Sequence, residues 1–255
     1  MANYPPIAAL LDPGPGVRRP VHAVRCFGGH QSMKLSVVVP VLNEAAGLPG
    51  LCEHLMPLVR QGVEVILVDG ASEDGSADLI ECMGFSLVRA PRGRALQMNA
   101  GAAAASGDVL LFLHADTRLP PAALQRLESR VTQVHDWGRF DVCIEGRSAM
   151  LKLVAWLMNG RSRLTGIATG DQALFMTRAA FDAVGGFPPQ PLMEDIEMSR
   201  RLRALARPIC LADQVRTSGR RWEQRGVWRT IFLMWRLRWA YWRGVPASQL
   251  AKAYR

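Results

Sequence analysis

The sequence predicts an α/β fold built around a doubly wound sheet. Short apolar runs rich in β-branched residues, the pattern of strands buried on both faces, alternate with segments of helical length. Most of these runs are followed directly by polar residues, which is where ligand-binding loops begin at the carboxyl edge of a parallel sheet. Alternation of strands and helices implies parallel strands with helices packed on both faces.

The first half of the chain supplies these elements in a regular order. We expect strands at residues 35–40, 63–68, 86–88 and 109–113, with helices at 45–60, 75–83 and 94–105. The second half is less regular, and there we expect a strand at 140–144, a helix at 148–158, a strand at 172–176 and a helix at 194–205. Glu197 and Arg201 support the last helix as an i, i+4 pair.

The two ends of the chain differ from the part between them. Residues 1–33 are rich in Pro and Gly and show neither strand nor helix period, so they are predicted to form a flexible arm. Residues 34–215 are predicted to form one catalytic domain, and residues 216–255 a basic, amphipathic helical segment. Its apolar stripe consists of Trp228, Ile231, Phe232, Trp235, Trp239 and Trp242, with Arg229, Arg236 and Arg243 along the adjoining edge.

The charge of the chain is concentrated in that last segment. Residues 216–255 hold nine Arg and one Lys against the single acid Glu223, which accounts for the whole net charge of +9. This distribution argues for a neutral enzyme with a cationic tail, which suits an anionic lipid surface as readily as nucleic acid. We expect no nucleic-acid partner. Trp and Arg on one helix suit the plane of a membrane interface. The alternative is that the stripe packs against the catalytic domain and closes its acceptor site.

Cysteine usage and hydropathy indicate a cytoplasmic protein. The five cysteines include no C-x-x-C pair, so neither a disulfide framework nor a zinc site is expected. No run of about 18 apolar residues occurs, and the first residues lack the basic and apolar regions of a secretory signal. We expect a cytoplasmic location, with peripheral contact at the inner face of the cell membrane.

Three carboxylates follow predicted strands. Glu44, Asp69 and Asp116 each lie just after a strand, so they converge at one edge of the sheet. Such carboxylates repel one another unless a cation, basic side chains or ligand hydroxyls lie between them. Each acid taken alone could instead cap the following helix, but the three together favour a site.

Two arginines begin the predicted helix at 94–105. Arg92 and Arg94 place guanidinium groups at a helix N-terminus, where bidentate hydrogen bonds and the helix dipole would favour a diphosphate. The alternative is a solvated loop with two surface charges.

Residues 34 to about 200 resemble a family 2 glycosyltransferase with the glycosyltransferase-A fold, whose Rossmann-like mixed sheet is flanked by helices. The resemblance rests on four motifs in the family's order. They are VVVPVLNE at 37–44, VDGASEDGS at 68–76, the stretch from Arg94 to Asn99 with Gly101 and Gly107-Asp108, and LHAD at 113–116.

The resemblance implies a nucleotide-sugar donor site. It assigns Asp69 to the nucleotide base and Asp116, as the second acid of a D-x-D motif, to a Mn²⁺ or Mg²⁺ ion on the diphosphate. His114 replaces the first acid, so the contacts of that acid are unassigned, and His114 is either structural or a metal ligand. The donor-site residues expected are Pro40, Asn43, Glu44, Asp69, Ser72, Arg94, Gln97, His114, Ala115 and Asp116.

The resemblance also implies an acceptor side. The residues at 184–188 and 193–197 resemble the family's acceptor element and its E-D motif, which makes Asp195 the expected general base of an inverting transfer. The alternative is that these acids offset the dipole of a helix N-terminus. The sugar or acceptor pocket is expected to contain Gly170, Asp171, Gln172 and Glu194, although Asp171 could simply cap a turn.

Two other functions compete with this one. A nucleotidyltransferase of the same fold would also use a metal-bound nucleotide, and a non-enzymatic membrane or nucleic-acid binding module would use the basic tail. Dinucleotide oxidoreductases and P-loop enzymes are disfavoured because neither G-x-G-x-x-G after the first strand nor G-x-x-x-x-G-K-[ST] occurs. The sequence does not identify the sugar, the nucleotide or the acceptor. The aromatic tail favours a lipid or another amphiphile as acceptor.

Overall fold

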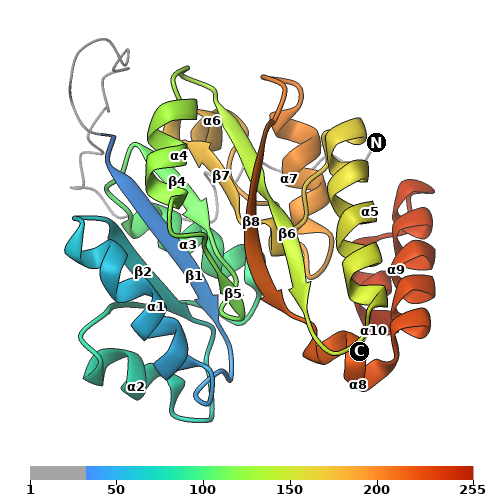
Figure 1. The fold of residues 1–255 in the computed structure, drawn as a ribbon, viewed down its shortest axis with the longest axis horizontal. Helices are drawn as coiled ribbons and strands as arrows, with labels where there is room; N and C mark the ends of the chain where they lie inside the picture. Colours follow the sequence, from blue (N-terminus) through green and yellow to red (C-terminus); the bar gives the residue numbers. More distant parts are fainter. Residues whose placement is uncertain (1–32, 255) are drawn as a thin grey trace, which may run out of the picture.

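The computed structural model describes residues 33–254, apart from the side chain of Arg221, so the predicted flexible arm lies almost wholly outside the described residues. The described chain forms an eight-stranded sheet in the order β3-β2-β1-β4-β7-β6-β8-β5 (Figure 1). Four neighbouring strands are parallel: β1 (Leu35–Val41), β2 (Glu64–Asp69), β3 (Ser86–Arg89) and β4 (Val109–Phe112).

The other half of the sheet is mixed. Strand β7 (Leu174–Thr177) is antiparallel to β4, and β6 (Trp137–Glu145) is antiparallel to β7. Strand β8 (Ile209–Ser218) pairs parallel to β6, and the short β5 (Thr117–Arg118) closes the edge against β8. The predicted α/β architecture is therefore confirmed, with a sheet that changes strand direction beside β4.

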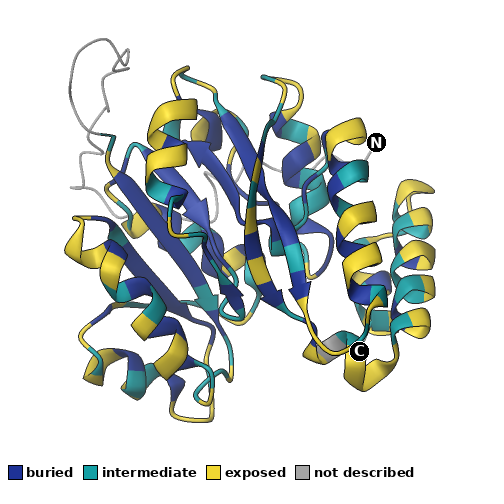
Figure 2. Ribbon diagram, in the orientation of Figure 1, coloured by how far each residue is buried: buried dark blue, intermediate teal, exposed yellow. Residues whose placement is uncertain are grey.

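Helices cover both faces of this sheet (Figure 2). One apolar core cluster joins the strands to α1 (Leu48–Arg60), α2 (Ser76–Cys82), α4 (Ala123–Arg130) and α5 (Met150–Thr165). The second cluster joins the opposite face to α3 (Arg94–Ala104), α6 (Arg178–Ala183) and α7 (Glu194–Leu202). The two layers explain why the central strands read as continuous apolar runs.

Strand β1 shows how the sequence specifies these layers. Val37 and Val39 point into the first cluster, and Val38, between them, points into the second. Helix α3 packs so closely on the second face that a Cβ atom at Gly101 would lie 2.3 Å from Val38 Cγ1. Glycine is therefore required where α3 crosses the strand.

The second half departs from the sequence-based boundaries. Helix α5 passes through Gly160 and ends at Thr165, because Gly166 takes a left-handed φ of 66° and stops it. The strand expected from residue 172 begins at Leu174, after a 3₁₀ turn, η2 (Gly170–Gln172). Strand β8 was not predicted, and it runs through residue 215, where the catalytic domain was expected to end.

The C-terminal segment is helical, as expected, and consists of α8 (Arg220–Arg225), α9 (Val227–Trp242) and α10 (Ala247–Tyr254). Leu237 of α9 and Leu250 of α10 are buried with Leu192 and Met193, which lie beside the start of α7. The segment therefore packs on the rest of the protein through one face of α9.

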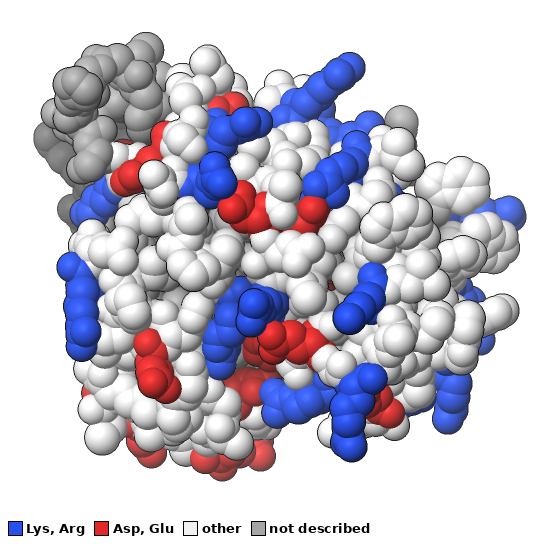
Figure 3. Space-filling view, in the orientation of Figure 1, with Lys and Arg blue, Asp and Glu red and all other residues white. Residues whose placement is uncertain are grey.

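The aromatic stripe lies on the other face of α9. Trp228, Phe232, Trp235, Trp239 and Trp242 are 60–79% exposed, whereas Ile231 is partly buried against the core. The alternative in which the stripe packs on the catalytic domain is therefore wrong for the aromatic residues, because the opposite face of the helix makes the contact. Figure 3 shows mostly uncharged surface at the edge formed by α9, interrupted by single basic side chains. Among the described residues, every helix is too short or too polar to cross a bilayer.

Candidate active site

The loops after β1 and β2 are tied to each other at the carboxyl edge of the sheet. The backbone N–H of Asn43 donates to Ser72 Oγ at 2.9 Å, and the N–H of Glu73 donates to Asn43 Oδ1 at 2.9 Å. The N–H of Glu44 donates to Ser76 Oγ at 3.0 Å. Asn43, Glu44 and Ser72, which were predicted to serve one donor site, therefore lie together.

Asp69 ends β2 and is 4% exposed. Its Oδ2 accepts hydrogen bonds from the N–H groups of Ala71 and Ser72, both at 3.1 Å. Its Oδ1 is buried and has no hydrogen-bond partner in the described chain. Because buried polar atoms are nearly always paired, this oxygen marks a place where a ligand donor would be stabilised.

The side chain of Gln97 links the ends of β1 and β2 by hydrogen bonds. Its side-chain Nε2 donates to the carbonyls of Val41 and Val68, at 2.7 and 2.9 Å, and the residue is 3% exposed. Pro40 lies in β1 directly before Val41, which accepts one of these hydrogen bonds, and is partly buried. The bonds made by Gln97 hold the backbone that carries the loops of the predicted donor site.

Residues 114–116, called the HAD motif below after their one-letter sequence, follow β4. His114 Nδ1 lies 3.1 Å from Asp171 Oδ1, which ties the end of β4 to the η2 turn. Asp116 is partly exposed, and its Oδ1 accepts a hydrogen bond from Thr117 at 3.3 Å. The charge of Arg118 acts on Asp116, but within the described chain the two side chains form no direct ion pair. The Ala115 carbonyl accepts from Arg118 at 3.1 Å.

The η2 turn connects the HAD motif with the predicted base. A Cβ atom at Gly170 would lie 2.4 Å from the His114 ring, so only glycine allows the turn to approach that closely. The Gly170 N–H donates to Asp195 Oδ2 at 2.9 Å. Asp195 Oδ1 accepts from the N–H of Ile196 at 2.8 Å, so both carboxylate oxygens are oriented by backbone donors.

Glu194 and Arg94 form an ion pair between the starts of α7 and α3. Their Oε1 and Nε atoms are 2.6 Å apart, and the side chains are 3% and 38% exposed respectively. Burial raises the pKa of the Glu194 carboxyl, and the charge of Arg94 opposes that shift. A predicted donor-side residue and a predicted acceptor-side residue are therefore in direct contact.

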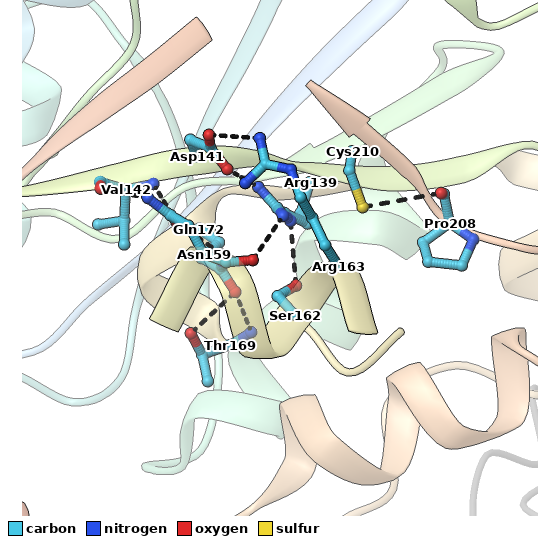
Figure 4. A network of polar contacts seen from close by, with 10 residues as sticks. All are labelled: Arg139, Asp141, Val142, Asn159, Ser162, Arg163, Thr169, Gln172, Pro208 and Cys210. Carbon is cyan, nitrogen blue, oxygen red and sulfur yellow. Dashed lines mark hydrogen bonds and ion pairs between the residues drawn. The ribbon is translucent and has the colours of Figure 1, made fainter. Parts of the chain in front are cut away.

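A buried polar network anchors the η2 turn (Figure 4). Gln172 Nε2 donates to Asn159 Oδ1 at 3.2 Å, and Asn159 exchanges two hydrogen bonds with the backbone of Val142 in β6. Gln172 Oε1 also accepts from the N–H of Thr169 at 3.1 Å. Gln172 is fully buried, so its side chain fixes the turn from the protein side.

Two charged residues of β6 complete this network. Arg139 is fully buried, pairs with Asp141 and donates to Ser162 Oγ at 3.0 Å. Asp141 is also paired with Arg163 of α5 at 2.6 Å. Sequence reasoning missed this network, although two opposite charges around a predicted strand at 140–144 were a signal for it.

Within residues 33–254, four residues other than glycine take the left-handed backbone conformation, and they fall in or beside the loops of the candidate site. They are Asn43, Ala71, Ala173 and Met193, with φ between 47° and 64°. Such conformations cost free energy and tend to cluster at functional sites. Their positions coincide with the loops after β1 and β2, the end of η2 and the start of α7.

Comparison with known proteins identifies the family. Residues 36–179, more than half of the chain, match the model for "Glycosyl transferase family 2". The undecaprenyl-phosphate 4-deoxy-4-formamido-L-arabinose transferase of Aeromonas hydrophila is 36% identical over 114 residues, which is 40% of this chain and 35% of that protein. The protein of the same name from Pseudomonas paraeruginosa is 34% identical over 113 residues, 40% of this chain and 33% of that one. The matches thus span about a third of the length of these relatives.

Solved structures agree with the fold. The mannosyltransferase PcManGT from Pyrobaculum calidifontis, in complex with GDP-Man and Mn²⁺, has a TM-score of 0.59 at 19% identity, covering 83% of this chain and 62% of that one. TarS of S. aureus in complex with UDP-GlcNAc has a TM-score of 0.58 at 18% identity, covering 73% and 58%. The predicted glycosyltransferase-A fold is confirmed by these neighbours. The chain belongs to glycosyl transferase family 2.

Proposed function

We propose that the protein transfers a sugar from a nucleotide-diphosphate sugar to an acceptor hydroxyl with inversion, using Asp195 as the general base. The observation that carries this proposal is the Gly170 turn, which contacts His114 of the HAD motif on one side and donates to Asp195 on the other. A donor held at the HAD motif would therefore lie beside an oriented carboxylate.

The chemistry follows from that placement. The acceptor oxygen attacks the anomeric carbon on the face opposite the diphosphate, and the new C–O bond forms while the bond to the diphosphate breaks. Asp195 takes the proton of the acceptor hydroxyl, and the diphosphate leaves with the bonding electrons. Backbone donors on both oxygens of Asp195 keep its carboxylate oriented for that proton.

The donor nucleotide is assigned to the loops after β1 and β2. The unpartnered Asp69 Oδ1 suits an N–H of a nucleotide base, and Asn43 and Ser72 hold the loop that would lie beside it. The nucleotide sugars bound to the structural neighbours, GDP-Man and UDP-GlcNAc, support this assignment. Which base and which sugar the chain uses depends on contacts outside these motifs.

A Mn²⁺ or Mg²⁺ ion is assigned to Asp116. The described residues contain no group of three or more His, Cys, Asp or Glu side chains placed for a metal. A partly exposed carboxylate that forms no direct ion pair in the described chain fits an ion that takes its other ligands from diphosphate oxygens and water. When bound, such an ion would stabilise the negative charge of the leaving diphosphate. His114 Nδ1 is already paired with Asp171, which favours a structural role for this histidine.

The acceptor is assigned to a lipid or another amphiphile, reached at an anionic membrane surface on the cytoplasmic side. The exposed aromatic stripe of α9 supports this, because Trp side chains suit the headgroup region and the flanking arginines suit anionic lipids. The matched relatives carry undecaprenyl phosphate in their names. If the protein pellets with anionic vesicles at low salt and not with neutral ones, this part is supported. Equal recovery in the supernatant contradicts it.

The test of the transfer is the variant Asp195→Asn. Loss of a general base lowers kcat by about 100-fold to 10,000-fold, while the affinity for a nucleoside diphosphate with Mn²⁺ stays as in the wild type. The matched control is Asp182→Asn, an exposed acid of α6. The proposal is wrong if Asp195→Asn keeps activity within threefold of the wild type, or if NMR of the product shows retention at the anomeric carbon.

A further inference from the structure

A pocket of about 840 Å³ lies between α7, α9, α10 and the end of α5. Four arginines contribute to its wall: Arg161, Arg200, Arg203 and Arg238. Aromatic surface comes from Tyr241 and Trp242 at the end of α9. The pocket therefore combines several arginines with a lining that is otherwise largely apolar.

The charge of this wall is only partly balanced. Among the described lining residues, Glu197 is the single acidic side chain, and it already forms an ion pair with Arg200 at 2.8 Å. For Arg161, Arg203 and Arg238, no acidic partner lies within ion-pair distance in the described part of the chain. The surplus of positive charge makes the pocket complementary to an anion.

Arg161 gives the strongest indication that the pocket binds an anionic ligand. Its Nε and Nη2 atoms are buried and have no hydrogen-bond partner among the described residues. Burying a charged group without partners is costly, so native proteins seldom do it unless a ligand supplies the acceptor. Burial also lowers the pKa of this guanidinium, and a bound anion would oppose that shift.

The pocket adjoins the predicted base. Ile196, which lines the pocket, follows Asp195 directly in α7, and the charge of Asp195 acts on Arg161. A group bound in the pocket would thus lie on the acceptor side of the site. Trp242 belongs both to the pocket wall and to the exposed stripe of α9, where it is 79% exposed. An apolar chain leaving the pocket would therefore meet aromatic surface.

We infer that this pocket binds the phosphate group of an amphiphilic acceptor, with the arginines around the phosphate and the apolar chain along Tyr241 and Trp242. The inference rests on the proposed function for its link to sugar transfer, and on the pocket alone for binding. Arginine is suited to this role because its planar fork gives paired hydrogen bonds to phosphate oxygens.

The test measures binding of geranyl phosphate, geraniol and inorganic phosphate by calorimetry, in the wild type and in two single variants, Arg203→Gln and Arg238→Gln. The expected result is that geranyl phosphate binds at least tenfold more tightly than either of the other probes. Each variant should weaken geranyl phosphate binding about tenfold or more. Arg207→Gln, an exposed arginine beyond α7 that does not line the pocket, should leave the affinity unchanged.

Three results would overturn the inference. If geraniol binds as tightly as geranyl phosphate, the pocket does not recognise the phosphate group. If inorganic phosphate binds as tightly as geranyl phosphate, the apolar chain makes no contribution to binding. If Arg207→Gln weakens binding as much as the two pocket variants do, the pocket is not the binding site. A nucleoside diphosphate with Mn²⁺ is measured in parallel on the same proteins. If geranyl phosphate binds as expected and the nucleotide does not bind at all, the proposed transfer fails while the pocket stands.

Discussion

The ion pair between Arg94 and Glu194 offers a quantitative test, because it joins the predicted donor and acceptor sides through a buried carboxylate. Replacing Arg94 by Met leaves Glu194, whose side chain is 3% exposed, without its cation. Removing one partner of a buried pair costs about 3–5 kcal/mol. Since the Arg94 side chain is 38% exposed, water compensates part of the loss, and we expect about 3 kcal/mol at neutral pH.

The loss should depend on pH, with a definite sign. Burial raises the pKa of Glu194, and removing Arg94 takes away the charge that opposes this rise. Folded Arg94→Met would then hold a proton that the unfolded chain has released. Relative to that of the wild type, its free energy of unfolding therefore falls as the pH rises from the raised pKa of Glu194 in the wild type to the still higher pKa in the variant.

The assay is urea denaturation followed by tryptophan fluorescence at pH 6 and pH 8. Arg92→Met, a change at the exposed neighbouring arginine, is the matched control and should leave stability unchanged. The double variant Arg94→Met with Glu194→Gln should recover most of the loss, because no buried charge remains. A loss below about 1 kcal/mol, or one equal at both pH values, would refute the reasoning.

Three further predictions concern the metal, the pocket and the tail. In Asp116→Asn, a nucleoside diphosphate should lose the stabilisation that depends on Mn²⁺, which is about 2.7 kcal/mol when the ligand is at 100 times its Kd, as read from the melting temperature. Arg161→Met should raise the free energy of unfolding of the ligand-free protein by about 1 kcal/mol, because two unpaired buried donors are removed, and a lower stability would contradict the geometry. Trp235→Ser should reduce pelleting with anionic vesicles without lowering the melting temperature, since Trp235 is 73% exposed.

The parallel half of the fold was predictable because its signals are local. Strands buried on both faces require the apolar runs seen at 35–40 and 63–68, and the structure has strands there within one residue at each end. The helix expected at 94–105 is α3. Each of these elements can be recognised from a few consecutive residues, so the prediction needs no information about contacts with distant segments.

The mixed half depends on contacts between distant segments. Strand β6 carries Arg139 and Asp141 inside the protein, where their charges are tolerated because they pair with each other and α5 supplies further partners. Strand β8 has one partly exposed face, and its pairing with β6 is interrupted by a bulge beside Phe140. Neither property can be derived from a local apolar pattern, which explains why β8 was not predicted.

The site was predictable to the level of loops but not of contacts. The motifs placed Asp69, His114 and Asp195 at ends of elements that the structure brings to one edge. Which side chains pair there depends on tertiary geometry, and so the contact of Arg94 with Glu194 was not foreseen. Arg161 was missed because the helix that carries it was expected to end at residue 158.

In the proposed mechanism, donor binding and proton transfer both depend on one short element, η2. Its first residue, Gly170, lies against the His114 ring and donates to Asp195, while its last, Gln172, is fixed by Asn159 to the backbone of β6. The turn cannot move toward the HAD motif without a clash, and it cannot move away without losing bonds in the interior. A base oriented by such a turn keeps its position relative to the donor because the buried network, and not the substrate, fixes it.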